Sequence, residues 1–240
     1  MQDFSESARL AFALLAGSDT SLWPIVRLSL GVSGAATLLA ALLALPLAAW
    51  LALTPFRGRG AVIALLNALM GLPSVVVGLL VYLLLSRAGP LGEHGLLFTP
   101  GAMVVAQTVL VLPLVTALAR QTLEDVLAEV GPYLRSLKAS RAETMMTALV
   151  EARWSLPTAL LAGFGRATAE VGAVMIVGGN IDGVTRVMTT AIALETSKGD
   201  LPLALGLGLV LLLVVLAVNV AAYAVRQAAM RREGTVAANA

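Results

Sequence analysis

Long apolar runs separated by short polar breaks make up most of this chain. A helix needs about 20 apolar residues to cross a hydrocarbon core of about 30 Å, because it rises about 1.5 Å per residue. The runs that meet this length cover residues 25–53, 61–85, 100–119, 156–177 and 201–225. Each is expected to be helical, since unpaired backbone groups are costly in lipid. The pattern predicts an all-α integral membrane protein with about five transmembrane helices.

Breaks inside and between the runs refine this picture. Pro73, in Gly71-Leu72-Pro73-Ser74, lies within the second run. Proline lacks the backbone N–H and kinks or ends a helix, so a hinge or broken point is expected there. Residues 54–60 form a tight basic turn, and residues 178–200 are predicted to be a polar loop.

Composition agrees with a membrane protein and argues against an enzyme. Of 240 residues, 59% are hydrophobic and 12% are charged, whereas a soluble domain has about 25% charged residues. Cysteine is absent, and the single histidine, His94, lies in a glycine-rich segment without a cluster of metal-ligand spacing, so no catalytic or metal site is expected. No glycine-rich loop ends in Gly-Lys-Ser or Gly-Lys-Thr, and no aromatic-basic patch suggests nucleic acid. We therefore expect no cofactor in this chain.

The basic residues predict an orientation. Ten lie on one side of the expected helices, namely Arg57, Arg59, Arg120, Arg135, Lys138, Arg141, Arg153, Arg226, Arg231 and Arg232. Five lie on the other, namely Arg9, Arg27, Arg87, Arg186 and Lys198. The richer side is expected to be cytoplasmic. This places the N-terminus outside and the C-terminus inside.

The N-terminal residues are too short to cross the membrane. Apolar residues between Phe4 and Leu15 recur at helical spacing, which predicts an interfacial helix within residues 1–20 on the outer face. The alternative is a sixth, broken transmembrane helix that would move the N-terminus inside.

Residues 121–155 form a charged segment of helical character between two apolar runs. Its charged residues are Glu124, Asp125, Glu129, Arg135, Lys138, Arg141, Glu143, Glu151 and Arg153. Because it would be held against the bilayer at both ends, we interpret it as a cytoplasmic docking surface for a soluble partner.

Polar residues inside the runs are the second candidate site. Arg166 and Glu170 are four residues apart and are expected to pair on one helix face. Each charge alone would cost about 2.5–3.5 kcal/mol at mid-bilayer. The pair, with Asn67, Gln107 and Thr108, is interpreted as lining a pathway or gate; the alternative is a structural ion pair. Five helices are too few to surround a hydrophilic pathway, which favours a dimer.

Several stretches resemble the transmembrane permease subunit of type I ABC importers. They are residues 71–79 (GLPSVVVGL), 84–92 (LLSRAGPLG), 97–100 (LFTP), 163–173 (GFGRATAEVGA) and 178–181 (GGNI). The likeness covers the chain from its first apolar run onward. It is strongest to the tungstate permeases, within the oxyanion group that also handles molybdate and sulfate.

The resemblance implies that residues 1–240 are one permease domain and that residues 121–155 hold a coupling helix. Leu137-Lys138-Ala139-Ser140-Arg141 resembles the core of that helix, with Lys138 where glycine is usual. The residues that would contact the ATPase are Arg135, Leu137, Lys138, Ala139, Ser140, Arg141, Glu143 and Thr144.

The family also implies partners and a location. Two copies of the chain would form the pathway in a bacterial cytoplasmic membrane, two cytoplasmic ATPase subunits would bind ATP and magnesium, and an external binding protein would deliver the oxyanion. The expected substrate is tungstate, with molybdate or sulfate as alternatives. A secondary carrier or channel, and a scaffold that transports nothing, are the alternatives from other classes.

Overall fold

The structure is a computed structural model that describes Arg9 and residues 22–238. This part of the chain is built from helices and contains no strand. The elements are α2 (Leu22–Leu53), α3 (Arg59–Met70), α4 (Ser74–Leu85), η1 (Gly92–His94), α5 (Pro100–Ser136), α6 (Arg141–Ala152), α7 (Leu156–Thr168), α8 (Gly172–Gly178), α9 (Met188–Lys198) and α10 (Leu201–Ala238). Apart from Arg9, the interfacial helix expected within residues 1–20 lies outside the described residues.

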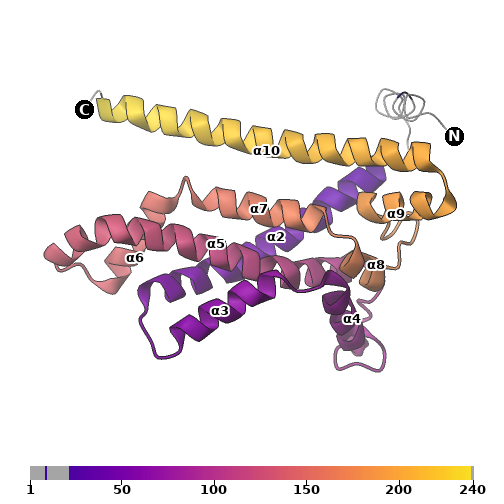
Figure 1. Cartoon of the computed structure of the whole chain (residues 1–240), viewed down its shortest axis with the longest axis horizontal. Helices are drawn as coiled ribbons and strands as arrows, with labels where there is room; N and C mark the ends of the chain where they lie inside the picture. The colour runs from indigo at the N-terminus through magenta and orange to yellow at the C-terminus, as the bar shows by residue number, and fades with distance from the viewer. Residues whose placement is uncertain (1–8, 10–21, 239–240) are drawn as a thin grey trace.

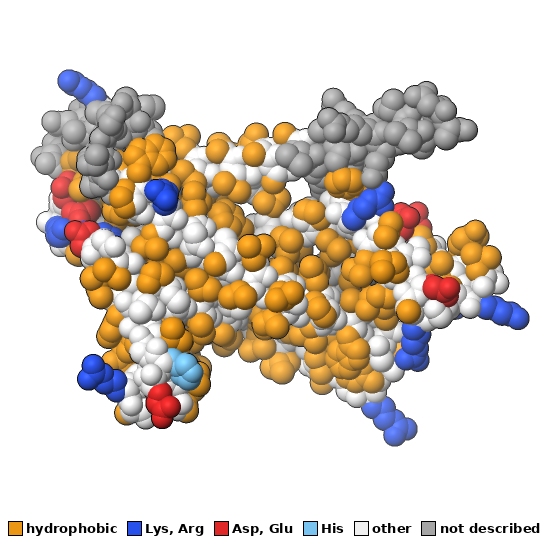
Figure 2. Space-filling view, turned by 180° about the vertical axis from the view of Figure 1, so that it is seen from behind, with side chains coloured by type: hydrophobic (Ala, Val, Ile, Leu, Met, Phe, Trp, Pro, Cys, Tyr) orange, Lys and Arg blue, Asp and Glu red, His pale blue; other side chains and the backbone are white. Residues whose placement is uncertain are grey.

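Long apolar helices confirm the predicted membrane architecture. Within the described residues, α2, α5 and α10 are each long and apolar enough to cross a bilayer, and the bent pairs α3–α4 and α7–α8 pass the same test when each pair is taken together. Helices α5, α7 and α10 lie roughly lengthwise beside one another, whereas α4 stands across them (Figure 1). Charged side chains gather toward the two ends of the molecule, and an apolar belt lies between them (Figure 2). This distribution suits a protein whose middle lies in lipid.

The second apolar run is broken where its proline predicted. Helices α3 and α4 meet at an angle of 98°. Gly71 and Leu72 donate only to carbonyls three residues back, Ala68 and Leu69, so the α-helical pattern ends there. Pro73 then precedes α4 with an extended backbone, φ −62° and ψ 121°. The predicted break at residues 71–74 is confirmed.

The fourth apolar run is also bent, which the hydrophobic pattern did not reveal. Helices α7 and α8 differ in direction by 59° across residues 169–171. The backbone N–H of Ala173, in the first turn of α8, donates to the Glu170 carboxylate (3.1 Å). The Thr189 hydroxyl donates to the Glu170 backbone oxygen (2.8 Å). Side chains therefore bind the groups that the bend releases, and they stabilise a break without proline.

Two other expectations need correction. Residues 178–200 were expected to be a loop but contain α9, whose first residues, Met188 to Ala191, are buried. The helix of the third apolar run does not end with that run near residue 119, because α5 is 37 residues long and extends from Pro100 to Ser136. The first half of the charged 121–155 segment is thus continuous with a membrane helix.

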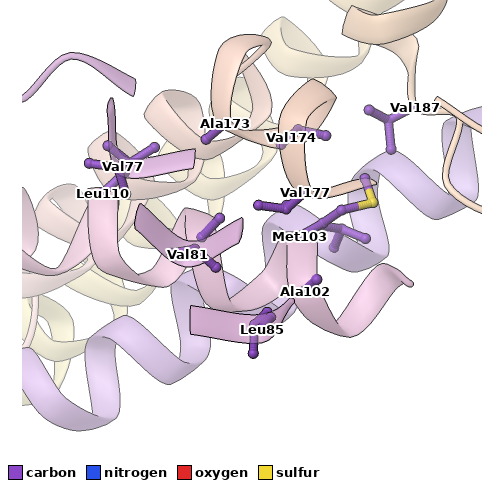
Figure 3. Packing of buried hydrophobic residues seen from close by; sticks show 12 residues of the cluster. Val77, Val81, Leu85, Ala102, Met103, Leu110, Ala173, Val174, Val177 and Val187 are labelled. Atoms are coloured by element: carbon purple, nitrogen blue, oxygen red, sulfur yellow. The ribbon is translucent and has the colours of Figure 1, made fainter. Parts of the chain in front are cut away.

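The second halves of the two bent pairs form the main core. Val77 and Val81 of α4, Met103 of α5, and Val174 and Val177 of α8 are buried against one another (Figure 3). A Cβ atom on Gly78 would lie 2.7 Å from the Ala173 Cα, so α4 and α8 are in backbone contact there. Helix α5 also packs along α2 and against α7. It is the element that contacts most of the fold.

Candidate functional site

The predicted Arg166–Glu170 pair forms at the bend between α7 and α8. Arg166 Nη1 lies 2.5 Å from Glu170 Oε2. The Glu170 side chain is 3% exposed, whereas that of Arg166 is 34% exposed. Glu170 is not on the same helix as Arg166, since α7 ends at Thr168. The pair therefore spans the end of α7 and the start of the bend.

The two bent pairs meet at their bends. The Ser74 hydroxyl, at the start of α4, hydrogen bonds to the Glu170 carboxylate. A Cβ atom on Gly172, at the start of α8, would lie 2.9 Å from Ser74 Oγ. Glu170 thus receives donors from α4, α7 and α8, and a buried carboxylate needs such donors to remain ionised. We call Ser74, Arg166, Glu170 and Gly172 the bend junction.

Of the other predicted pathway residues, Gln107 lies next to this junction. Its Nε2 donates to the Ala167 backbone oxygen (2.9 Å), while its buried Oε1 has no hydrogen-bond partner within the described part of the chain. Thr108 donates to Val104 on its own helix (2.7 Å) and lies 3.4 Å from the Ala36 oxygen of α2. Helix α5 thereby connects α2 and α7.

The structure does not bring Asn67 into this group. Asn67 lies on α3, on the other limb of the 98° break from Ser74, and its side chain is exposed. An exposed amide on an apolar helix is costly in lipid. Asn67 is therefore better placed to face a protein neighbour or water than the junction.

The predicted coupling residues fall on a turn between two helices. Arg135 is in the last turn of α5, and Leu137 caps that helix. The Lys138 N–H donates to Arg135 and the Ala139 N–H to Leu134, a Schellman arrangement. Lys138 adopts φ 55°, the left-handed conformation that favours glycine. Lys138, where the resemblance implies a glycine, thus occupies the position directly after the C-cap, which has positive φ here.

Helix α6 starts with a capping box that the sequence analysis missed. Ser140 Oγ accepts the Glu143 N–H (3.2 Å), and Glu143 Oε2 accepts the Ser140 N–H (2.6 Å). Two hydrogen bonds with Ser140 lower the pKa of Glu143 below its ordinary value. The larger effect comes from the Ser140 backbone N–H and the smaller from the Ser140 side chain. Ser-x-x-Glu is a recognisable signal for this motif. Arg141 and Thr144 lie in the first turn of α6.

Exposed apolar side chains accompany these charges on residues 133–150, which we call the coupling segment. They are Tyr133, Leu137, Met146 and Val150. They alternate with the exposed charges of Arg135, Lys138, Arg141 and Glu143. Apolar side chains surrounded by charges are typical of a surface that binds another protein.

A charge cluster at the base of this segment was not anticipated. Arg59 at the start of α3 and Arg120 of α5 both pair with the Glu124 carboxylate. Arg59 Nε also donates to the Leu51 backbone oxygen at the end of α2 (2.8 Å). We call Arg59, Arg120 and Glu124 the base cluster. It joins three membrane helices at the point where α5 extends toward the coupling segment.

Comparison with characterised proteins identifies the family. No protein-family model matches the chain. A tungstate uptake system permease protein, TupB, of Peptoclostridium acidaminophilum is 40% identical over 227 residues, which cover 95% of this chain and 100% of that protein. A protein described as a probable anion ABC transporter permease, of Haloferax volcanii, is 40% identical over 93% of this chain and 98% of its own length.

More distant similarity extends to molybdenum transport. The permease protein ModB of Azotobacter vinelandii is 30% identical over 175 residues, 70% of this chain and 77% of that protein. The apolar helices agree with a multi-pass membrane protein, and the relatives are transport permeases rather than enzymes. This chain belongs to the family of ABC transporter permeases that includes the tungstate and molybdate permeases.

Proposed function

We propose that this chain is the membrane-spanning subunit of an ATP-driven tungstate importer. One structural feature supports the coupling: α5 is one helix from Gln107, beside the bend junction, to the exposed turn at Leu137, with Pro113 and Pro132 inside it. A displacement at the turn would therefore reach the membrane core along a single helix. The relatives that cover nearly the whole chain supply the substrate class.

The ATPase is proposed to bind the coupling segment. Tyr133, Leu137 and Met146 offer apolar contacts, and Arg135, Lys138 and Arg141 offer charged ones. ATP and magnesium would be bound by that subunit, and this chain would hold no cofactor. The coupling segment would then be cytoplasmic, with the N-terminus outside and the C-terminus inside.

A second copy of the chain is proposed to complete the pathway. Helix α3 carries the exposed amide of Asn67 between exposed apolar residues such as Leu65 and Met70. A neighbouring copy, or water between two copies, would relieve the cost of that amide in lipid. An external binding protein would supply the anion on the opposite side of the membrane.

The bend junction is proposed to be the gate. Bent helices with interrupted backbone bonds are the elements most able to change direction in a membrane. Arg166 is the positively charged residue of the junction and is partly exposed. Its ion-pair partner, Glu170, is buried. Because Glu170 already neutralises Arg166, a tungstate dianion would bind there only weakly. Weak binding suits a pathway that must release its substrate.

ATPase stimulation tests the proposal. The chain, its ATPase and the loaded binding protein are reconstituted in nanodiscs, and phosphate release is measured with tungstate, molybdate or sulfate. Tungstate-loaded binding protein should raise the rate of phosphate release several-fold. This corresponds to a coupling free energy of about 1–2 kcal/mol between the binding-protein site and the ATPase. Equal rates with and without loaded protein would refute ATP coupling, and stimulation by sulfate alone would reassign the substrate.

A further inference from the structure

A second polar feature lies far from the coupling segment, at the opposite end of α2. A cavity of about 680 Å³ opens between the first turns of α2 and the segment that joins α8 to α9. Two guanidinium side chains, Arg27 and Arg186, contribute to its lining, with Asp182 as the third charged residue. Pro24 and Ile25 supply apolar walls. Neither the gate nor the coupling segment uses these residues.

The Arg186 side chain has bonding capacity to spare. Its Nη1 pairs with Asp182 Oδ1 at 3.0 Å. Its Nε is buried and has no hydrogen-bond partner among the described residues. A guanidinium binds oxyanions through parallel N–H donors, and an unpartnered buried donor is costly. An oxyanion in the cavity would meet the part of Arg186 that lines it, and would reach the enclosed Nε only after the side chain turns.

The charge balance of the cavity favours an anion. Arg27 and Arg186 contribute two positive charges against the single negative charge of Asp182. The Asp182 side chain is 77% exposed and so is strongly screened by water, whereas that of Arg186 is only 23% exposed. Water therefore weakens the field of Asp182 more than that of Arg186. The stronger field inside the cavity is positive and attracts an anion.

From this geometry we infer that the cavity binds a tetrahedral oxyanion. The inference rests on the proposed function, since it assigns an oxyanion importer a first contact for its substrate away from the gate. The same chemistry is offered by a free tungstate ion and by a lipid phosphate. Trp23 is exposed four residues before Arg27, as is common where a helix enters the headgroup region.

Equilibrium binding of tungstate to the full chain tests the inference without the ATPase. The chain is placed in phosphatidylcholine nanodiscs, and binding is measured for wild type, Arg186→Gln, Arg186→Lys, Arg27→Gln and Asp182→Asn. Arg186→Gln should weaken binding about tenfold or more, and Arg186→Lys, which keeps the charge but loses the fork, should weaken it less. Asp182→Asn should strengthen binding about threefold, because it removes the competing carboxylate.

Arg87→Gln is the matched control, since it removes an exposed arginine that does not line the cavity. It should bind like wild type. A second arm measures enrichment of phosphatidylglycerol around wild type and Arg186→Gln. If only this enrichment depends on Arg186, the anion is a lipid phosphate. If neither tungstate nor phosphatidylglycerol distinguishes Arg186→Gln from Arg87→Gln, the inference is wrong, whatever the complete transporter does with tungstate.

Discussion

At the scale of single residues, the members of the Arg166–Glu170 pair are not equivalent. Glu170 is enclosed and receives donors from three helices, while a third of the Arg166 side chain is exposed. Losing either partner leaves the other charge unpaired, and the cost grows with burial of the charge that remains. The carboxylate is therefore the member that most needs its partner.

This asymmetry predicts an order of stability. Arg166→Gln leaves a buried carboxylate and should lower the free energy of unfolding by about 3–5 kcal/mol. Glu170→Gln leaves a partly hydrated guanidinium and should cost clearly less. The double variant should recover part of the Arg166→Gln loss. Thermal unfolding in detergent gives the order; equal losses for the two single variants would contradict it.

Lys138 is the residue with backbone strain in the coupling turn. Its left-handed conformation costs a non-glycine residue about 1 kcal/mol or more. Lys138→Gly should therefore stabilise the turn by about 0.5–1 kcal/mol after the added entropy of the unfolded chain is subtracted. Hydrogen exchange at the Ala139 amide measures the gain. Lys138→Ala, which keeps the Cβ atom, is the control and should show none.

Glu143 makes the start of α6 sensitive to acid. Its folded-state pKa lies below the ordinary value of 4.5, because the Ser140 N–H donates to the carboxylate. The stabilisation is therefore complete above about pH 4.5 and declines as the pH falls through the lower folded-state pKa. Hydrogen exchange in α6 between pH 6 and 3 should show this loss. Glu143→Gln should abolish the pH dependence; an unchanged profile would disprove the assignment.

At the scale of elements, the contact of α4 with α8 depends on a glycine. A Cβ atom on Gly78 would press on Ala173 backbone, which cannot move aside as a flexible side chain can. Gly78→Ala should cost about 1–3 kcal/mol through overpacking. Gly34→Ala on α2 is the control, since nothing lies within 4 Å of its added Cβ. Comparable unfolding midpoints for the two variants would contradict the close packing.

The sequence predicted some elements and missed others for identifiable reasons. The membrane helices were predicted from the apolar runs, and the break between α3 and α4 from Pro73. Both predictions depend only on local properties of the chain. The bend at residues 169–171 has no proline and depends on Ser74 and Thr189, which are distant in sequence. Helix α9 was missed because its burial comes from tertiary contacts with the rest of the fold.

The candidate sites show the same division. The spacing of Arg166 and Glu170 was sufficient to predict their pair, and the exposed coupling segment was visible as a run of charge. The base cluster was missed because Arg59 appeared to be only a turn residue. Its partner, Glu124, is 65 positions away, and no local pattern connects them.

At the scale of the whole molecule, the base cluster and α5 connect the two candidate sites. The cluster fixes α5 to α2 and α3 on the side of the coupling segment. The bend junction lies toward the other end of α5, through Gln107 and Ala167. We therefore expect movement of the coupling segment to be transmitted along α5 to the bend junction.

Uptake into proteoliposomes tests whether this chain transports tungstate at the expense of ATP. Vesicles holding the chain and its ATPase receive loaded binding protein outside and ATP inside, and tungstate accumulation is followed with time. We expect uptake that requires ATP, the ATPase and the binding protein together. Tungstate uptake by the chain alone, driven by an ion gradient without ATP, would contradict it and would favour a secondary carrier.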